Sequence, residues 1–297
     1  GRIYVMEHGN STGGGTTGSG RTINKGIYAL NSDCSDALGQ GNTGLTGGLE
    51  AFDIFAPTAN STYEPWKIVV GEDDYVYVSD AQNPRGGLAR VNPNLADGQL
   101  VLAGVGNTAA TNLHTVVYGI KVTGFLDDGT LSILGIDGQA STWAPNTVMR
   151  WNVGIDLPSE IPPEPQFVAS TSGAGEQDSD IDVHPNGNIF VLFYRSTWNG
   201  PTPGLQVFDP SGTQLFTSYQ NGVELFGTNR SLKISPDGNT LAILRNDRRV
   251  VLIGLTNGVP DLSSSNFLAT FNASTSAGTR AVDWDAAGNL YVGNNAS

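Results

Sequence analysis

The stretch that decides the fold covers residues 232–243 and reads LKISPDGNTLAI. At its start Leu232, Lys233 and Ile234 alternate apolar and polar, which is the period of a strand with one buried face. The Asp237-Gly238 pair then supplies the positive φ that a tight turn requires, and a second apolar run follows. The stretch therefore predicts a β-hairpin.

The same hairpin recurs along the chain. Two clear copies occupy residues 181–191 (IDVHPNGNIFV) and 282–292 (VDWDAAGNLYV), and weaker copies lie at 68–78 and 128–131. The sequence opens at residues 1–5 with GRIYV, which matches the second strand of the hairpin without the first. With the turn residue as marker, the copies stand at positions 1, 74, 129, 187, 238 and 288, which is a period near 50 after a longer first interval.

A period of about 50 residues accommodates four short strands with tight connections, which is one propeller blade. Apolar third strands follow the hairpins at 87–91, 148–151, 205–208 and 249–252. A βαβ unit would need a helix, and no ten-residue stretch keeps helical apolar spacing without Gly or Pro.

We therefore expect an all-β fold, a single β-propeller domain over residues 1–297 with about six four-stranded blades. The first and last blades are expected to be incomplete, because the sequence opens and closes in mid-repeat. The long first interval is explained by a Gly/Thr/Ser-rich insertion at residues 9–21.

The copies at 236–239 (PDGN) and 286–292 (AAGNLYV) resemble the repeats of NHL and YVTN-type propellers, and the similarity covers most of the chain. The resemblance implies a propeller of a secreted bacterial surface kind. Such families include binding modules, surface-layer proteins and, more distantly, lactonases of the regucalcin type. Because one fold hosts many functions, the resemblance carries over the architecture alone.

The lactonase resemblance implies a divalent cation held by an early Glu, later Asn residues and a late Asp. Here Glu64 precedes Pro65-Trp66 in a faintly similar early motif, and Asp283 is a conceivable late partner. The intervening Asn ligands match no motif, and a hard cation needs several converging oxygens. We therefore predict no metal ligand and no cofactor, with Glu64 a loop carboxylate and Asp283 an outward strand residue.

Other reactive groups fit structural roles better than catalytic ones. His8, His114 and His184 lie in unlike contexts, and no Gly-x-Ser-x-Gly elbow accompanies them, so we predict polar or capping histidines and no catalytic residue. Cys34 is flanked by Asp33 and Asp36, whose charges disfavour a thiolate nucleophile. The acidic run 178–182 (DSDID) lacks the Gly and distal Glu of an EF-type loop, so we expect the solvated start of a strand.

One set of residues indicates a ligand site. The positions eight residues before each turn marker should begin the innermost strands, at the rim of a central channel. In an acidic protein, a ring with one Lys and two Arg could attract an anion. The alternative is that these cations pair with acidic neighbours such as Asp178, Asp180 and Asp283. The set comprises Trp66, Lys121, Ser179, Arg230 and Arg280.

The composition excludes some classes of binding partner. The chain has 15 basic and 28 acidic residues, a formal charge of -13 and a single cysteine. That balance disfavours nucleic acid and acidic membranes, and the apolar runs are too short for membrane insertion. Abundant small polar residues with few lysines favour an extracellular or cell-surface location. Five Asn-x-Ser/Thr sequons are possible glycosylation sites, at Asn10, Asn60, Asn229, Asn272 and Asn295.

These observations predict a non-catalytic extracellular propeller, a structural or interaction module of a secreted surface assembly. Strands near residues 1–5 and 290–292, in incomplete terminal blades, could pair with another molecule and build filaments. One alternative is a metal-dependent lactonase or other hydrolase that uses the channel. Another is a module that binds glycans or small ligands through loop tryptophans such as Trp143 and Trp198.

Overall fold

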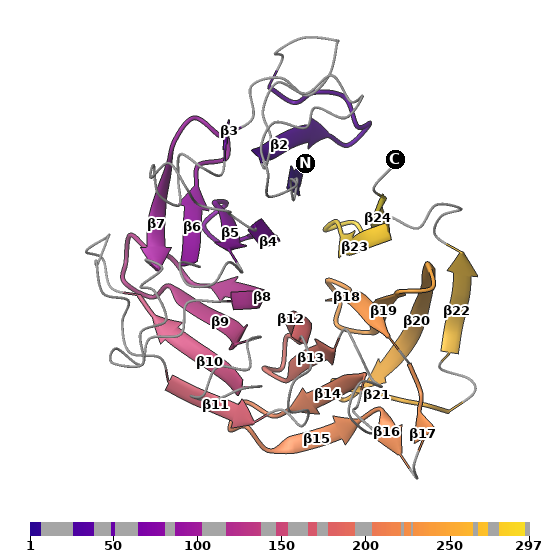
Figure 1. Cartoon of the computed structure of the whole chain (residues 1–297). Helices are drawn as coiled ribbons and strands as arrows, with labels where there is room; N and C mark the ends of the chain where they lie inside the picture. The colour runs from indigo at the N-terminus through magenta and orange to yellow at the C-terminus, as the bar shows by residue number, and fades with distance from the viewer. Residues whose placement is uncertain are drawn as a thin grey trace, which may run out of the picture. The chain divides into compact units, whose positions relative to one another are not determined.

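The computed structural model shows an all-β chain (Figure 1). The residues that it describes form strands and turns, and none of them belongs to a helix that could cross a membrane. The chain divides into two compact units, unit 1 with Gly1–Gly135 and Arg150–Gln166, and unit 2 with Ile136–Met149 and Phe167–Ser297. The described residues are 1–6, 26–38, 49–50, 65–80, 87–102, 117–137, 147–153, 166–170, 178–193, 204–220, 223–226, 228–263, 267–272 and 279–294.

In unit 1 two antiparallel sheets, of strand order β1-β2-β3 and β4-β5-β6-β7, pack against each other. Ile27 and Ala29 from the first sheet and Val76 and Val78 from the second are buried in their shared core. The strands are β1 (Arg2–Met6), β2 (Gly26–Asn31), β3 (Leu49–Glu50), β4 (Pro65–Val70), β5 (Val76–Asp80), β6 (Gly87–Val91) and β7 (Gly98–Leu102).

Another four-stranded sheet has the order β11-β10-β9-β8, so each strand lies beside its neighbour in sequence. Its first strand, β8, packs beside β4 of unit 1. Its strands are β8 (Val117–Thr123), β9 (Ser132–Asp137), β10 (Thr147–Asn152) and β11 (Gln166–Ser170).

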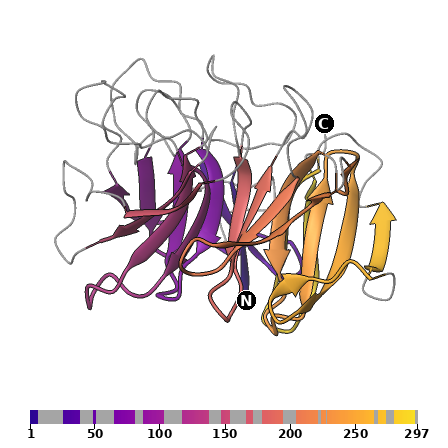
Figure 2. The same ribbon diagram turned by 90° about the horizontal axis from the view of Figure 1, so that it is seen from below.

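Unit 2 contains a sheet of order β12-β13-β14-β15 and a sheet in which β18, β19, β20 and β22 are neighbours, with β21 also paired to β20. The orange strands of this second sheet lie side by side in Figure 2. The strands are β12 (Asp178–Val183), β13 (Ile189–Phe193), β14 (Leu205–Phe208), β15 (Gln214–Thr217), β16 (Tyr219–Gln220), β17 (Val223–Glu224), β18 (Asn229–Ile234), β19 (Thr240–Arg245), β20 (Arg249–Thr256), β21 (Val259–Pro260), β22 (Phe267–Asn272), β23 (Thr279–Trp284) and β24 (Leu290–Asn294).

The repeated turns lie in equivalent places, as the sequence predicts. Gly187, Gly238 and Gly288 have φ of 96°, 72° and 83°, and each donates its amide to the carbonyl three residues earlier. Asp74 and Gly129 occupy the same position, with φ of 62° and 74°. In the Asp-Gly and Asn-Gly pairs only the glycine has a positive φ. The turn is therefore one whose last residue alone adopts the left-handed conformation.

The expected one-sided burial of the strands is wrong in unit 2. β13 and β14 are buried along their whole length, and Lys233 is buried as its neighbours Leu232 and Ile234 are. The sheet of β18 packs on the β12–β15 sheet through one face and on β23 and β24 through the other. Because both faces meet protein, alternate residues are both removed from water.

The predicted third strands are confirmed as β6, β10, β14 and β20. Four of the sheets place four antiparallel strands side by side, in the manner of propeller blades. The sheets of β1 and of β23 contain three and two strands among the described residues.

Candidate functional site

Four of the five predicted rim residues share one structural feature, a β-bulge at the start of the first strand of their sheets, whereas Lys121 lies within β8. The pairing register shifts between Pro65 and Lys67, between Asp178 and Asp180, between Asn229 and Ser231, and between Thr279 and Ala281. A bulge leaves one residue out of the ladder, and bulges are common beside functional sites. The residues left out are Trp66, Ser179, Arg230 and Arg280.

The structure brings these positions together within each unit. In unit 2, β12 packs beside β18 and β18 beside β23, so the bulges at Ser179, Arg230 and Arg280 lie on neighbouring strands. In unit 1, β4 with Trp66 packs beside β8 with the partly exposed Lys121. Arg230 donates from Nε to Asn246 Oδ1 at 2.8 Å.

Two buried aspartates join the innermost strands of unit 2. Asp180 Oδ1 accepts the amide of Ile181 at 2.9 Å, while its Oδ2 accepts the amide of Leu232 at 3.0 Å and the hydroxyl of Ser231 at 2.8 Å. The two carboxylate oxygens thus bridge β12 and β18. Since innermost strands have an unpaired edge, the bridge satisfies amides that would otherwise need water.

Asp182 repeats the arrangement one step along the strands. Its Oδ1 accepts the amide of Val183 and its Oδ2 that of Ile234, both at 3.0 Å. At the next junction Ser231 Oγ accepts the amide of Val282 at 3.4 Å. Successive innermost strands are therefore joined by side-chain oxygens bonded to backbone amides.

This finding corrects the expectation of a solvated strand start at residues 178–182. The run does begin a strand, β12, but Asp180 and Asp182 are only 0% and 2% exposed. Amide donors of β18 take the place of water around both carboxylates, which makes burial of the acidic run possible.

Lys233 on β18 lies among three of these acidic groups. Burial would lower the pKa of Lys233, but the charges of Asp182, Asp283 and Asp180 outweigh burial and raise that pKa. Its carbonyl accepts the indole N–H of Trp284 at 3.2 Å. The buried ammonium is therefore held charged by carboxylates from both neighbouring strands.

The lactonase resemblance pointed to two possible metal ligands, Glu64 and Asp283. Asp283 is exposed on β23, as predicted for an outward residue, and its Oδ1 accepts the amide of Trp284 at 3.0 Å. Glu64 lies outside the described residues. Across the part of the chain that the structure describes, no three His, Cys, Asp or Glu side chains gather as a metal site would require.

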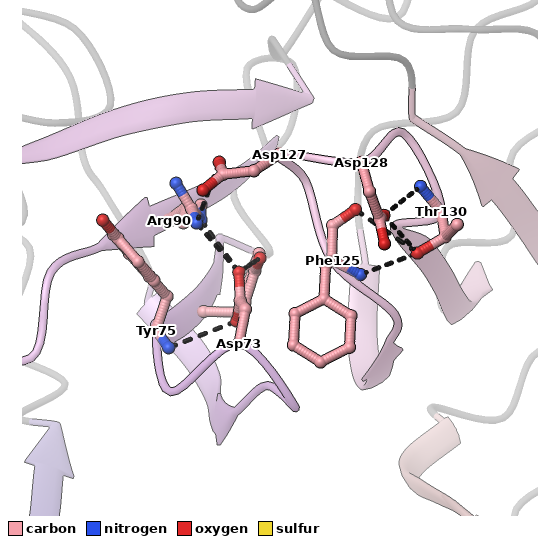
Figure 3. A network of polar contacts seen from close by, with 8 residues as sticks. Asp73, Tyr75, Arg90, Phe125, Asp127, Asp128 and Thr130 are labelled. Carbon is pink, nitrogen blue, oxygen red and sulfur yellow. Dashed lines mark hydrogen bonds and ion pairs between the residues drawn. The ribbon is translucent and has the colours of Figure 1, made fainter.

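A second charged cluster, in unit 1, carries no clear sequence signal (Figure 3). Arg90 on β6 donates from Nε and Nη2 to Asp73 Oδ2 at 3.1 and 3.0 Å, and Tyr77 donates its hydroxyl to the same oxygen at 2.8 Å. The Arg90 guanidinium stacks on Tyr75, 3.3 Å from the ring centroid. An Asp in a turn and an Arg on the third strand are far apart in sequence, so only the sheet brings them together.

The electrostatics of this cluster favour the charged pair. Burial alone would lower the pKa of Arg90, but its bonds to Asp73 raise it. Burial together with Asp73 raises the pKa of Tyr77 well above its usual range. The cluster also reaches the β8–β9 turn, because Asp127 lies 4.0 Å from Arg90 and Glu72 accepts the amide of Gly124 at 2.8 Å.

His184 caps a turn, as predicted. Its Nδ1 accepts the amide of Asn186 at 3.1 Å, and Nε2 lies 2.9 Å from the carbonyl of Gly238 in the next hairpin. His8 and His114 lie outside the described residues. Cys34 is an exposed free thiol with φ of 65°.

The sequons differ in accessibility. Asn229 is fully buried and its amide donates to the carbonyl of Gly204, so the folded protein has no room for a glycan at this position. Asn272 is exposed on β22. Asn10, Asn60 and Asn295 lie outside the described residues.

Comparison with solved structures defines the class of fold. The chain is similar to a putative 6-phosphogluconolactonase from Bacteroides uniformis, with a TM-score of 0.57 and 14% identity over 98% of this chain and 74% of that one. It is similar to the WD40 beta propeller domain of Doa1, with a TM-score of 0.52 and 13% identity over 90% and 68%. Virginiamycin B lyase from Staphylococcus aureus gives 0.51 and 10% over 99% and 82%.

These similarities, together with the four-stranded sheets, define a β-propeller protein. No protein-family model and no curated protein sequence matches the chain. At such low identities the likeness is one of fold, and the function must be argued from the residues themselves.

Proposed function

We propose that the chain is a non-catalytic β-propeller that serves as a structural or interaction module of a secreted surface assembly. The observation that carries this proposal is the role of the innermost carboxylates. Asp180 and Asp182 each use both oxygens as acceptors for backbone amides. A general acid or a metal ligand instead directs an oxygen toward substrate or metal.

Several finer features belong to the same proposal. The six hairpin markers support about six blades in one domain, related to NHL and YVTN-type propellers. Small polar residues and few lysines support an extracellular or cell-surface location, and Asn272, exposed on β22, is a candidate glycan acceptor. The proposed ligand-binding positions are Trp66 and Lys121 in unit 1, and Arg230 and Arg280 in unit 2.

Self-association is the proposed route to assembly. β1 lies at the edge of its sheet, and β24 is paired with β23 alone among the described strands. Strand edges with unpaired amides and carbonyls readily accept a further strand. Light scattering and electron microscopy should show concentration-dependent filaments, and a monomer at high concentration would overturn this part of the proposal.

The catalytic alternative is tested directly. Metal-stripped protein, and protein reconstituted with Ca²⁺, Mg²⁺ or Zn²⁺, is assayed for hydrolysis of glucono-δ-lactone. We expect no hydrolysis above the buffer rate with any metal, and no change for Glu64→Gln. Metal-dependent turnover that Glu64→Gln abolishes would overturn the non-catalytic proposal and establish a lactonase.

A further inference from the structure

β22 is the outermost strand of its sheet in unit 2 and has an open edge (Figure 1). Its partner among the described strands is β20 alone, so its other edge offers backbone amides and carbonyls that no described strand pairs. A bulge at Leu268 interrupts the ladder with β20, whereas residues 269–272 pair regularly. Edge strands are commonly protected from further pairing by charged side chains or proline, and the sequence of β22, FLATFN, has neither.

The side chains of β22 are also uncovered. Leu268 and Phe271 are 53% and 40% exposed, and none of residues 268–272 is buried. The outermost strands of the other three four-stranded sheets each bury at least one side chain. Those side chains are Val101 of β7, Ala169 of β11 and Phe216 of β15. The residues of β20 that pair with Phe271 and Thr270 are buried, so the core of this sheet ends at β20 and leaves β22 as an exposed apolar strand.

The two ends of this sheet carry opposite charges. The basic end, at the start of β18 and the β19–β20 turn, has Arg230, Arg245, Arg248 and Arg249 against Asp247 alone. The acidic end, residues 235–239 and 255–263, has Asp237 and Asp261 and no basic residue. β22 runs from the acidic end to the basic end, since Asn272 pairs with Arg249. A second copy added antiparallel to β22 would place its basic end beside the acidic end of the first, whereas parallel addition would place like charges together.

From the open edge, the uncovered side chains and the polarity of the sheet we propose that β22 pairs antiparallel with β22 of a second copy of this chain. Thr270 is the middle of the exposed residues 268–272, and a two-fold axis there sets Thr270 opposite its counterpart and Ala269 opposite Phe271 of the other copy. Because β22 is uncharged, two copies of formal charge -13 meet there without like charges in contact. The two-fold contact closes at two copies and so differs from the filament contacts of β1 and β24.

The key variant is Leu268→Lys, which introduces the kind of charge that protects other edge strands. Sedimentation velocity over a concentration series measures the monomer–dimer equilibrium. The protein is made in a host that adds no N-linked glycan, since a glycan on Asn272 would block the strand edge. We expect the parent to dimerise in the micromolar range, because a pair of short strands makes a small interface. Leu268→Lys should raise the dimer dissociation constant about tenfold, and so should Thr270→Lys, which sets two lysines opposite each other.

Leu215→Lys is the matched control. Leu215 is 45% exposed, lies at a bulge in β15, which is also an outermost strand of unit 2, and gives the same change in charge. It should leave dimerisation unchanged, and all three variants should keep the melting temperature of the monomeric parent, since the replaced side chains are exposed. A parent that stays monomeric, or equal weakening by Leu215→Lys, would overturn the proposal. Dimers that persist in both β22 variants would place the contact on another edge, such as β1 or β24, and would equally overturn it.

Discussion

The charged clusters of the two units stabilise their sheets by different means. In unit 1, Asp73 and Arg90 are in direct contact, and stacking on Tyr75 adds to the pair. In unit 2, Asp180 and Asp182 bind backbone amides of the neighbouring strand, while Lys233 is balanced by the field of several carboxylates. The first arrangement depends on side-chain geometry, and the second on carboxylates that serve two strands at once.

The largest effect is expected from Asp182→Ala. The substitution removes the acceptor of the Ile234 amide and a charge that stabilises Lys233, so the free energy of unfolding should fall by about 3–5 kcal/mol. Urea denaturation measures the loss. In Asp182→Ala/Lys233→Met, with no buried ammonium, part of the stability should return. A double variant whose loss equals the sum of the two single losses would show that Asp182 and Lys233 are not coupled.

A smaller effect is expected from Arg90→Lys in unit 1. Lysine keeps the charge but loses the two-nitrogen contact with Asp73 and the flat stacking on Tyr75, so the free energy of unfolding should fall by about 2 kcal/mol. Tyr75→Leu, which removes the stacking alone, should cost about 1 kcal/mol. If Arg90→Lys left the urea midpoint unchanged, the positive charge alone would account for the stabilising effect of Arg90. The Asp73–Arg90 pair would then resemble Lys233, which is balanced by the charges of nearby carboxylates.

A matched pair of glycines tests contact between hairpins. Gly288→Ala meets no atom within 4 Å and should cost about 1 kcal/mol for its positive φ. Gly238→Ala has similar strain, but its Cβ would lie 2.9 Å from His184 Nε2, so it should cost about 1 kcal/mol more. Thermal unfolding of both variants measures the difference in stability. Equal losses of stability would mean that the His184 side chain moves aside at no cost.

The smallest effect concerns an exposed carboxylate in the repeated turn. Hydrogen bonds from Ser235 and Asn239 lower the pKa of Asp237 from 3.8 to about 2. A lowered carboxyl pKa stabilises the fold above about pH 4, and that stability is lost as pH falls toward about 2. Urea midpoints of Asp237→Asn between pH 2 and 7 should therefore vary less than those of the parent. An unchanged pH profile would contradict this role.

Much of the fold could be predicted because its signals are local. The turns at Gly187, Gly238 and Gly288 identify hairpins whose geometry depends on a few adjacent residues, and the apolar third strands follow the hairpins as short runs of their own. The same spacing picked out Arg230 and Arg280 as special positions, although the bulge that makes them so became visible only in the register.

The sequence by itself determined the repeated hairpins, their turns, the third strands and the acidic balance, because each depends on neighbouring residues or on composition. Tertiary structure alone decided that Asp180 and Asp182 are buried and that Arg90 contacts Asp73. Burial of these charges depends on donors from another strand, since the amides of Leu232 and Ile234, which bind Asp180 and Asp182, lie 52 residues further along the chain. No local pattern of residues encodes such a pairing; packing of one sheet on the next creates it.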